Sequence, residues 1–273
     1  MTPITTKLER IVVLLDDTTS TAEQQLPWAR LIAAGRDIPL TLFHVVEASR
    51  VGEPIEVAKA MARDYLELVA TRLRAEPGSP AVDVVVEDGL VQEEWREYSA
   101  ANPGSLLIAA DFYEPGGTHS LRYKPLDGVL GACPTPLLVV PPRAEVPNAI
   151  ERVVVGTGGD ELADAVADYV HTQAAPGVDI IEVEAIERGH LPDHQLIELK
   201  PALTDDYISI RGKAGPVILA VARLRDAQLI VVGAHTKGAI RTLLVGSTSQ
   251  WLARNSDRPV LIVPEQWVSE AAN

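Results

Sequence analysis

The feature that most constrains how this chain can fold is an internal repeat. The segment SLLIAADFYEP (105–115) parallels QLIVVGAHTKG (228–238), and PLLVVPP (136–142) parallels PVLIVPE (259–265). The two members of each pair are separated by the same number of residues, and so are the glycines that end VVVEDG and ISIRG. A common offset across separate segments indicates two homologous units. The sequence therefore predicts two domains, residues 1–145 and 146–273.

Within each unit, short apolar runs alternate with helical periodicity. The first unit has one clear helix candidate, 54–74, and its strand candidates are 10–15, 39–46, 82–87, 105–110 and 136–140. Their nearly continuous apolar character is typical of strands covered on both faces. Alternating strands and helices favour parallel pairing with right-handed crossovers. We therefore predict an α/β fold with two tandem open, mostly parallel five-stranded sheets, each with helices on both faces.

Composition narrows the partners that such a chain can have. With 47% hydrophobic and 23% charged residues, the chain can bury ordinary cores. The formal net charge of -14 argues against binding to nucleic acid or to an anionic membrane surface. The single cysteine, Cys133, cannot form an internal disulfide, and no apolar run approaches the roughly 20 residues of a membrane span. We expect a cytoplasmic protein with no membrane or nucleic-acid partner.

The most distinctive stretch of the chain follows the fourth strand candidate of the second unit. From Ala227 to Ser256 there is no Asp or Glu, although the protein as a whole is acidic. Free backbone N–H groups at a helix start, together with hydroxyls and bases, can hold phosphate oxygens. The stretch supplies all of these in Gly233, Lys237, Gly238, Arg241, Gly246, Ser247, Thr248 and Ser249. It therefore indicates an anion site.

The second unit resembles a universal stress protein domain. The resemblance rests on ERVVVG, VDIIEVEAI, YISIRG and DAQLIVVGAHTKGAIRTLLVGSTSQWLARNSDRPVLIVP, and it extends over nearly the whole chain as a tandem pair. That family carries the ATP-binding signature Gly-x2-Gly-x9-Gly-Ser/Thr. Gly233, Gly246 and Ser247 match it, whereas Thr236 replaces its second glycine. The resemblance implies a sheet order of 3-2-1-4-5 and binding of ATP, ADP or AMP, with Mg²⁺ as a companion ion.

The resemblance also assigns roles within the second unit. Ribose and phosphates would be held by Gly233, Thr236, Gly246 and Ser247, with Thr248 and Ser249 at the helix start and Gly238 within the loop. Lys237 and Arg241 would add positive charge, and His235 would donate a hydrogen bond. The adenine slot would be lined by Gly156, Thr157, Gly158 and Val183. No catalytic residue and no protein metal site are predicted.

The first unit shows the opposite pattern. It keeps, as Asp16, the aspartate after strand one that reads adenine in the family, whereas the second unit has Gly158 there. Its phosphate loop has diverged, because the four signature positions hold Ala110, Tyr113, Tyr123 and Lys124. Asp16 therefore belongs to a degenerate site.

Three functions remain open at this point. The first is a non-catalytic stress-response regulator that binds an adenine nucleotide, with at most slow and incidental ATP hydrolysis. The second is a nucleotide-free interaction module in which both sites have decayed. The third is an ATP-cleaving enzyme with a pyrophosphate loop at 157–161, which is disfavoured because Leu162 follows where a hydroxyl residue is needed; helix capping by Asp160 is the simpler interpretation. In the family the last strand mediates pairing, which implies an internal pseudo-dimer and homodimerisation as a further expectation.

Overall fold

The computed structural model describes residues 8–15, 19–47, 54–110, 129–130, 134–142, 144–158, 160–186, 206–237, 242–243 and 247–271. The chain divides into two compact units, Lys7–Val146 and Pro147–Asn273, which we call the first and the second unit. Within the described ranges, none of the helices combines the length and the apolar character that a bilayer crossing requires.

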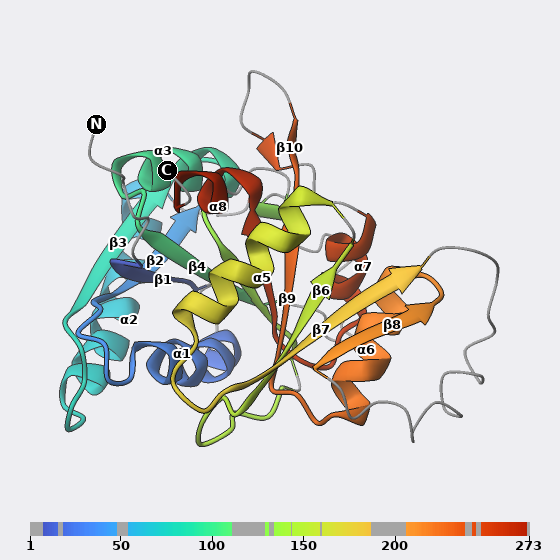
Figure 1. Cartoon of the computed structure of the whole chain (residues 1–273). Helices are drawn as coiled ribbons and strands as arrows, with labels where there is room; N and C mark the ends of the chain where they lie inside the picture. Colours follow the sequence, from blue (N-terminus) through green and yellow to red (C-terminus); the bar gives the residue numbers. More distant parts are fainter. Residues whose placement is uncertain are drawn as a thin grey trace, which may run out of the picture. The chain divides into compact units, whose positions relative to one another are not determined.

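The first unit is a parallel sheet with helices between its strands (Figure 1). Its strands, in the order β3-β2-β1-β4-β5, are β1 (Arg10–Leu14), β2 (Leu40–Val46), β3 (Val82–Asp88), β4 (Ser105–Ala110) and β5 (Leu137–Val140). Its helices include α1 (Thr19–Ala33), α2 (Ile55–Arg74) and α3 (Val91–Ala101). Phe43 of β2 meets two rings of α3, Trp95 and Tyr98, at centroid distances of 6.1 and 5.1 Å.

The second unit repeats this arrangement. Its parallel strands, in the order β12-β9-β6-β7-β8, are β6 (Arg152–Thr157), β7 (Asp179–Ile186), β8 (Tyr207–Arg211), β9 (Leu229–Ala234) and β12 (Val260–Pro264). Its helices include α5 (Glu161–Gln173), α6 (Ala214–Leu224), α7 (Ser247–Asn255) and α8 (Glu265–Ala271). The predicted α/β fold with strand order 3-2-1-4-5 in each unit is confirmed.

Helices cover both faces of the second sheet, which explains its continuous apolar strands. Val153 and Val155 of β6 belong to one buried cluster with residues of α5 and α8, such as Val166 and Trp267. The alternate position, Gly156, faces α6 instead. Because successive residues of a strand point to opposite faces, α5 and α8 lie on one face, and α6 lies on the other, where it contacts α7.

The strand order of the second sheet reverses next to β6. From β6 the chain runs through α5 to β7 on one side, whereas β9 pairs with β6 on its other side. Gly156 is thus in register with Val183 of β7 and Val232 of β9. In open α/β sheets, ligands bind outside the carboxyl ends of the strands at such a reversal. Most of the predicted nucleotide-binding residues of the second unit that the structure describes lie in or next to β6, β7 or β9; the others are in α7 or in the short hairpin after β9.

Candidate functional site

Two glycines near the carboxyl ends of β6 and β9 let helices approach the sheet closely. A Cβ on Gly156 would lie 2.6 Å from Ile218 Cδ1 of α6. A Cβ on Gly233 would lie 2.9 Å from Leu162 Cγ of α5. Real Cβ contacts are essentially never this short, so a side chain at either position would force the packed helix residues to shift. Neither glycine needs a ligand to explain it.

Thr157, the last residue of β6, has a hydroxyl that is buried and unpartnered. Its side chain is 7% exposed, and Oγ1 makes no hydrogen bond to any part of the chain that the structure describes. Val153 and Val155 point into the cluster beneath α5, and strand alternation places Thr157 on that same face. An unsatisfied buried hydroxyl costs about 1–3 kcal/mol. Thr157 therefore carries an unsatisfied hydroxyl at the end of β6, on the face that α5 covers.

His235, directly after β9, lies between two carboxylates (its side chain is half exposed). Its Nε2 is 3.1 Å from Asp160 Oδ2, and its Nδ1 is 3.6 Å from Glu265 Oε2. Asp160 precedes α5, and Glu265 is the first residue of α8. The imidazole therefore connects the end of β9 to the starts of both helices on one face of the sheet.

Asp160 also begins α5 in the way that the sequence indicates. Its Oδ1 accepts a hydrogen bond of 2.9 Å from the backbone N–H of Ala163, which is an N-cap interaction. Its other oxygen, Oδ2, faces His235. Each oxygen of this carboxylate thus has its own partner, one in the helix backbone and one in the predicted phosphate loop.

The loop after β9 contains a short hairpin. β10 (Thr236–Lys237) pairs antiparallel with β11 (Thr242–Leu243), with Thr236 opposite Leu243. In the family signature, position 236 is a glycine, but here the backbone is extended, and a β-branched residue suits that conformation. The threonine is therefore compatible with the loop. The side chains of Thr236 and Lys237 lie outside the described residues.

Helix α7 starts with the three hydroxyl residues that the sequence predicts. Ser247 is exposed, Thr248 is half-buried and Ser249 is 1% exposed. The first turn has no acidic residue, so nothing there opposes an anion near the positive end of the helix dipole. Ser249 already has an interaction within the protein, which leaves Ser247 and Thr248 as the available hydroxyls.

The remaining predicted site residues differ in their surroundings. Val183 is fully buried, so it belongs to the core beneath the predicted adenine slot. A Cβ on Gly158 would meet no atom within 4 Å, which leaves open space at the end of β6. Four predicted positions lie outside the described residues: Asp16, Gly238, Arg241 and Gly246.

Sequence reasoning missed the partners of His235. Asp160 stands 75 residues before His235, and Glu265 belongs to a helix of seven residues that follows the last strand. No motif links these three positions. The one available signal was their topology, because each lies within three residues of the end of a strand, and these strand ends lie at the same edge of the sheet.

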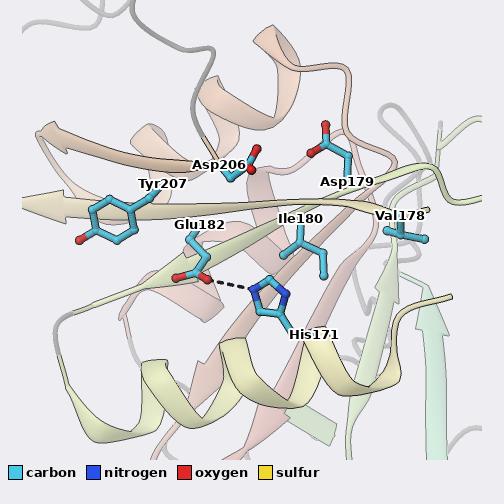
Figure 2. A pocket seen from close by; sticks show the side chains of 7 residues that line it. All are labelled: His171, Val178, Asp179, Ile180, Glu182, Asp206 and Tyr207. Carbon is cyan, nitrogen blue, oxygen red and sulfur yellow. Dashed lines mark hydrogen bonds and ion pairs between the residues drawn. The ribbon is translucent and has the colours of Figure 1, made fainter. Parts of the chain in front are cut away.

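A hollow of about 360 Å³ lies elsewhere in the second unit (Figure 2). It is found where β7 and β8 begin, at the edge opposite to the predicted loop, and is lined by His171, Val178, Asp179, Ile180, Glu182, Asp206 and Tyr207. Figure 2 shows His171 of α5 reaching Glu182 of β7, at 3.0 Å. Nearby, the phenol of Tyr207 donates a hydrogen bond to Glu184, and this bond raises the pKa of Tyr207. This hollow is not the predicted nucleotide site.

No three His, Cys, Asp or Glu side chains of the described ranges are arranged to hold a metal ion.

Comparison with known proteins identifies relatives along most of the chain. The model of the universal stress protein family matches residues 7–141 and 194–264. A universal stress protein of Mycolicibacterium smegmatis is 25% identical over 279 aligned residues, which cover 90% of this chain and 94% of the relative. The family match omits 142–193, where β6, α5 and β7 lie.

Solved structures share the fold of both units. The crystal structure of a universal stress protein from Archaeoglobus fulgidus superposes with a TM-score of 0.68 at 18% identity, covering 94% of this chain and 99% of that one. A structure from Pseudomonas aeruginosa gives a TM-score of 0.66 at 17% identity, covering 98% and 97%. Because its family model matches more than half of the residues, the chain belongs to the universal stress protein family.

Proposed function

We propose that the second unit binds ATP, or a related adenine nucleotide, at the carboxyl ends of β6 and β9. The protein acts in the cytoplasm as a non-catalytic regulator of a stress response. The nucleotide brings Mg²⁺ on its phosphates, since the described residues offer no metal site of their own. The first unit, with its diverged loop, serves as a structural partner.

The observation that carries the proposal is the unpartnered hydroxyl of Thr157. It lies where the strand order reverses, with the open space of Gly158 directly after it. Ligands of open α/β sheets bind at this place, and if the end of β6 opened locally, a ligand atom would relieve the cost of the buried hydroxyl. The nucleotide's polar groups are donors and acceptors of the required kind.

The start of α7 supports the phosphate end of the proposal. Ser247 is exposed at the first position of a helix whose first turn has no acidic residue. Exposed backbone N–H groups and a hydroxyl at a helix start are suited to an anion. These features favour an anionic ligand over a neutral one.

The described residues support binding better than catalysis. His235, the one imidazole of the predicted site, is paired with Asp160 and Glu265 and has no nucleophile beside it. A general base must lie within hydrogen-bonding reach of the proton that it removes. Any hydrolysis of bound ATP is therefore slow and incidental.

The proposal is tested by calorimetric titration of the nucleotide-stripped protein with ATP and Mg²⁺. We expect one site with micromolar affinity, weakened by Thr157→Val, which replaces the hydroxyl with a methyl group of similar size. Thr41→Val, in a buried strand of the first unit, is the matched control and should leave the affinity unchanged. A folded protein that shows no heat at millimolar ATP would refute the proposal.

One observation favours the second candidate, a nucleotide-free interaction module. His235 already has two carboxylate partners, and their negative charge disfavours phosphate nearby. Under this reading, Thr157→Val and charge-neutral variants at Asp160 and Glu265 would all fail to produce a nucleotide response. The same titrations therefore separate the two candidates.

A further inference from the structure

We infer that Asp160 and Glu265 are specificity determinants of the proposed nucleotide site. The two carboxylates compete with ligand phosphates for His235. They thereby weaken the binding of a nucleotide in proportion to the charge on its phosphates. This inference rests on the proposed function, and it concerns which adenine nucleotide the site prefers. It does not require any change in the fold.

The geometry places both carboxylates on the imidazole that the phosphates would need. Asp160 Oδ2 is 3.1 Å from His235 Nε2, and Glu265 Oε2 is 3.6 Å from Nδ1. Both ring nitrogens therefore face a carboxylate, so neither can donate to a phosphate unless it leaves its present partner. The three side chains are about half exposed (51%, 51% and 42%), so a ligand can approach them from solvent.

The charge around His235 from the helices on this face is negative. α5 contributes Asp160 at its cap and Glu161 as its first residue, and α8 contributes Glu265. Glu161 is exposed, and the ion pairs between described residues that involve His235 are with Asp160 and Glu265. A phosphate that reaches the imidazole must approach these carboxylates, and like charges a few ångströms apart repel each other even near water. Repulsion grows with each added phosphate, whereas an uncharged nucleoside does not experience it.

A second feature of this face is a hydroxyl that a ligand could satisfy only if the end of β6 opened locally. Thr157 Oγ1 is buried and unpartnered among the described residues, and it belongs to the face that α5 covers. Asp160 follows Thr157 by three residues and caps α5. A molecule that satisfies Thr157 therefore binds next to the carboxylates, and its charge matters there.

The test compares adenosine, AMP, ADP and ATP by calorimetry in the presence of EDTA, so that no metal ion masks the phosphates. Asp160→Asn keeps an N-cap oxygen for Ala163 and removes the charge that faces His235; Glu265→Gln removes the other. We expect each single variant to bind ATP about threefold more tightly, and the double variant roughly tenfold, as exposed ion pairs of this kind allow. The gain should shrink from ATP to AMP and vanish for adenosine.

Glu161→Gln is the matched control, because it removes the same charge from the same helical turn without touching His235. Its gain in affinity for ATP should be clearly smaller than that of Asp160→Asn. Raising the salt concentration should reduce the gain in affinity of every variant. Equal gains for adenosine and ATP, or no gain in the double variant while the wild type binds ATP, would overturn the inference. If neither wild type nor variants bind any of the four compounds, with or without Mg²⁺, the proposed function fails instead.

Discussion

Replacing Thr157 with valine should make the protein more stable and its nucleotide binding weaker. Thr157 is 7% exposed, and its hydroxyl is buried without a partner among the described residues, so the folded state bears a desolvation cost of about 1–3 kcal/mol. Valine has nearly the same shape and suits a strand equally well. We therefore expect the free energy of unfolding without ligand to rise by about 1–2 kcal/mol.

The assay is urea unfolding with and without ATP. At a slope of roughly 2 kcal/mol per molar urea, the gain shifts the midpoint of the second unit upward by about 0.5–1 M. In saturating ATP, the difference between the urea midpoints of the variant and the wild type should shrink or change sign. The reason is that a lost hydrogen bond of about 0.5–1.5 kcal/mol weakens ATP binding roughly two- to tenfold. Ligand stabilisation depends on the ratio of concentration to Kd, so one ATP concentration suffices for both proteins.

Thr41→Val provides a control in which the free energy of unfolding should change in the opposite direction. Thr41 is also a buried threonine of a parallel strand, but its hydroxyl accepts a hydrogen bond of 2.9 Å from Arg10 Nη1. Hydrogen bonds to charged groups are worth about 1.5–3 kcal/mol, so this variant should unfold at lower urea. A destabilised Thr157→Val protein would refute the reasoning, because it would show that Oγ1 has a partner in the ligand-free protein.

Three further predictions concern packing and ionisation. Gly156→Ala should destabilise the second unit by about 1–3 kcal/mol, because its Cβ would lie 2.6 Å from a side-chain carbon, whereas Gly158→Ala, with open space around it, should stay within about 0.5 kcal/mol of wild type in the same urea titration. Burial, followed by neighbouring carboxylates, raises the pKa of Glu94 above its ordinary 4.5. The contribution of Glu94 to stability is therefore complete below pH 4.5 and is lost as the pH rises. In pH-dependent unfolding, Glu94→Gln should be more stable than wild type at pH 7 and equally stable at pH 4. The hydrogen bond to Glu184 raises the pKa of Tyr207, so Glu184→Gln should lower the phenol's midpoint toward 10 in an absorbance titration; an unchanged midpoint would exclude this bond as the cause.

The central strands could be predicted from sequence because they are buried on both faces. An apolar run bounded by polar residues then has sharp ends, and the strand predicted at 105–110 is observed as Ser105–Ala110, with every residue buried. The hairpin of β10 and β11 has only two residues per strand, too few for any periodicity. Helix α8 is only seven residues long and follows directly after Pro264, so it gives a similarly weak signal.

The strand ends that carry the candidate site could be predicted from sequence, but the contacts between their residues could not. The topology rule placed it at the carboxyl ends of β6 and β9, and Asp160 was correctly interpreted as a helix cap. The pairing of His235 with Asp160 joins residues 75 positions apart, which a single sequence does not encode visibly. Nor does a sequence show that Thr157 is left without a partner, because that depends on everything packed around it.

The packing of Gly233 against α5 affects how its signature should be used to survey relatives. As long as a residue of leucine size occupies position 162 in the first turn of α5, a side chain at position 233 is selected against, with or without a ligand. A lineage that abandons nucleotides would therefore keep the glycine for many generations. Ser247, exposed at the start of α7, has no such packing constraint and would drift first. Substitution of the serine, rather than persistence of the glycine, is therefore the better indicator that a relative has lost nucleotide binding.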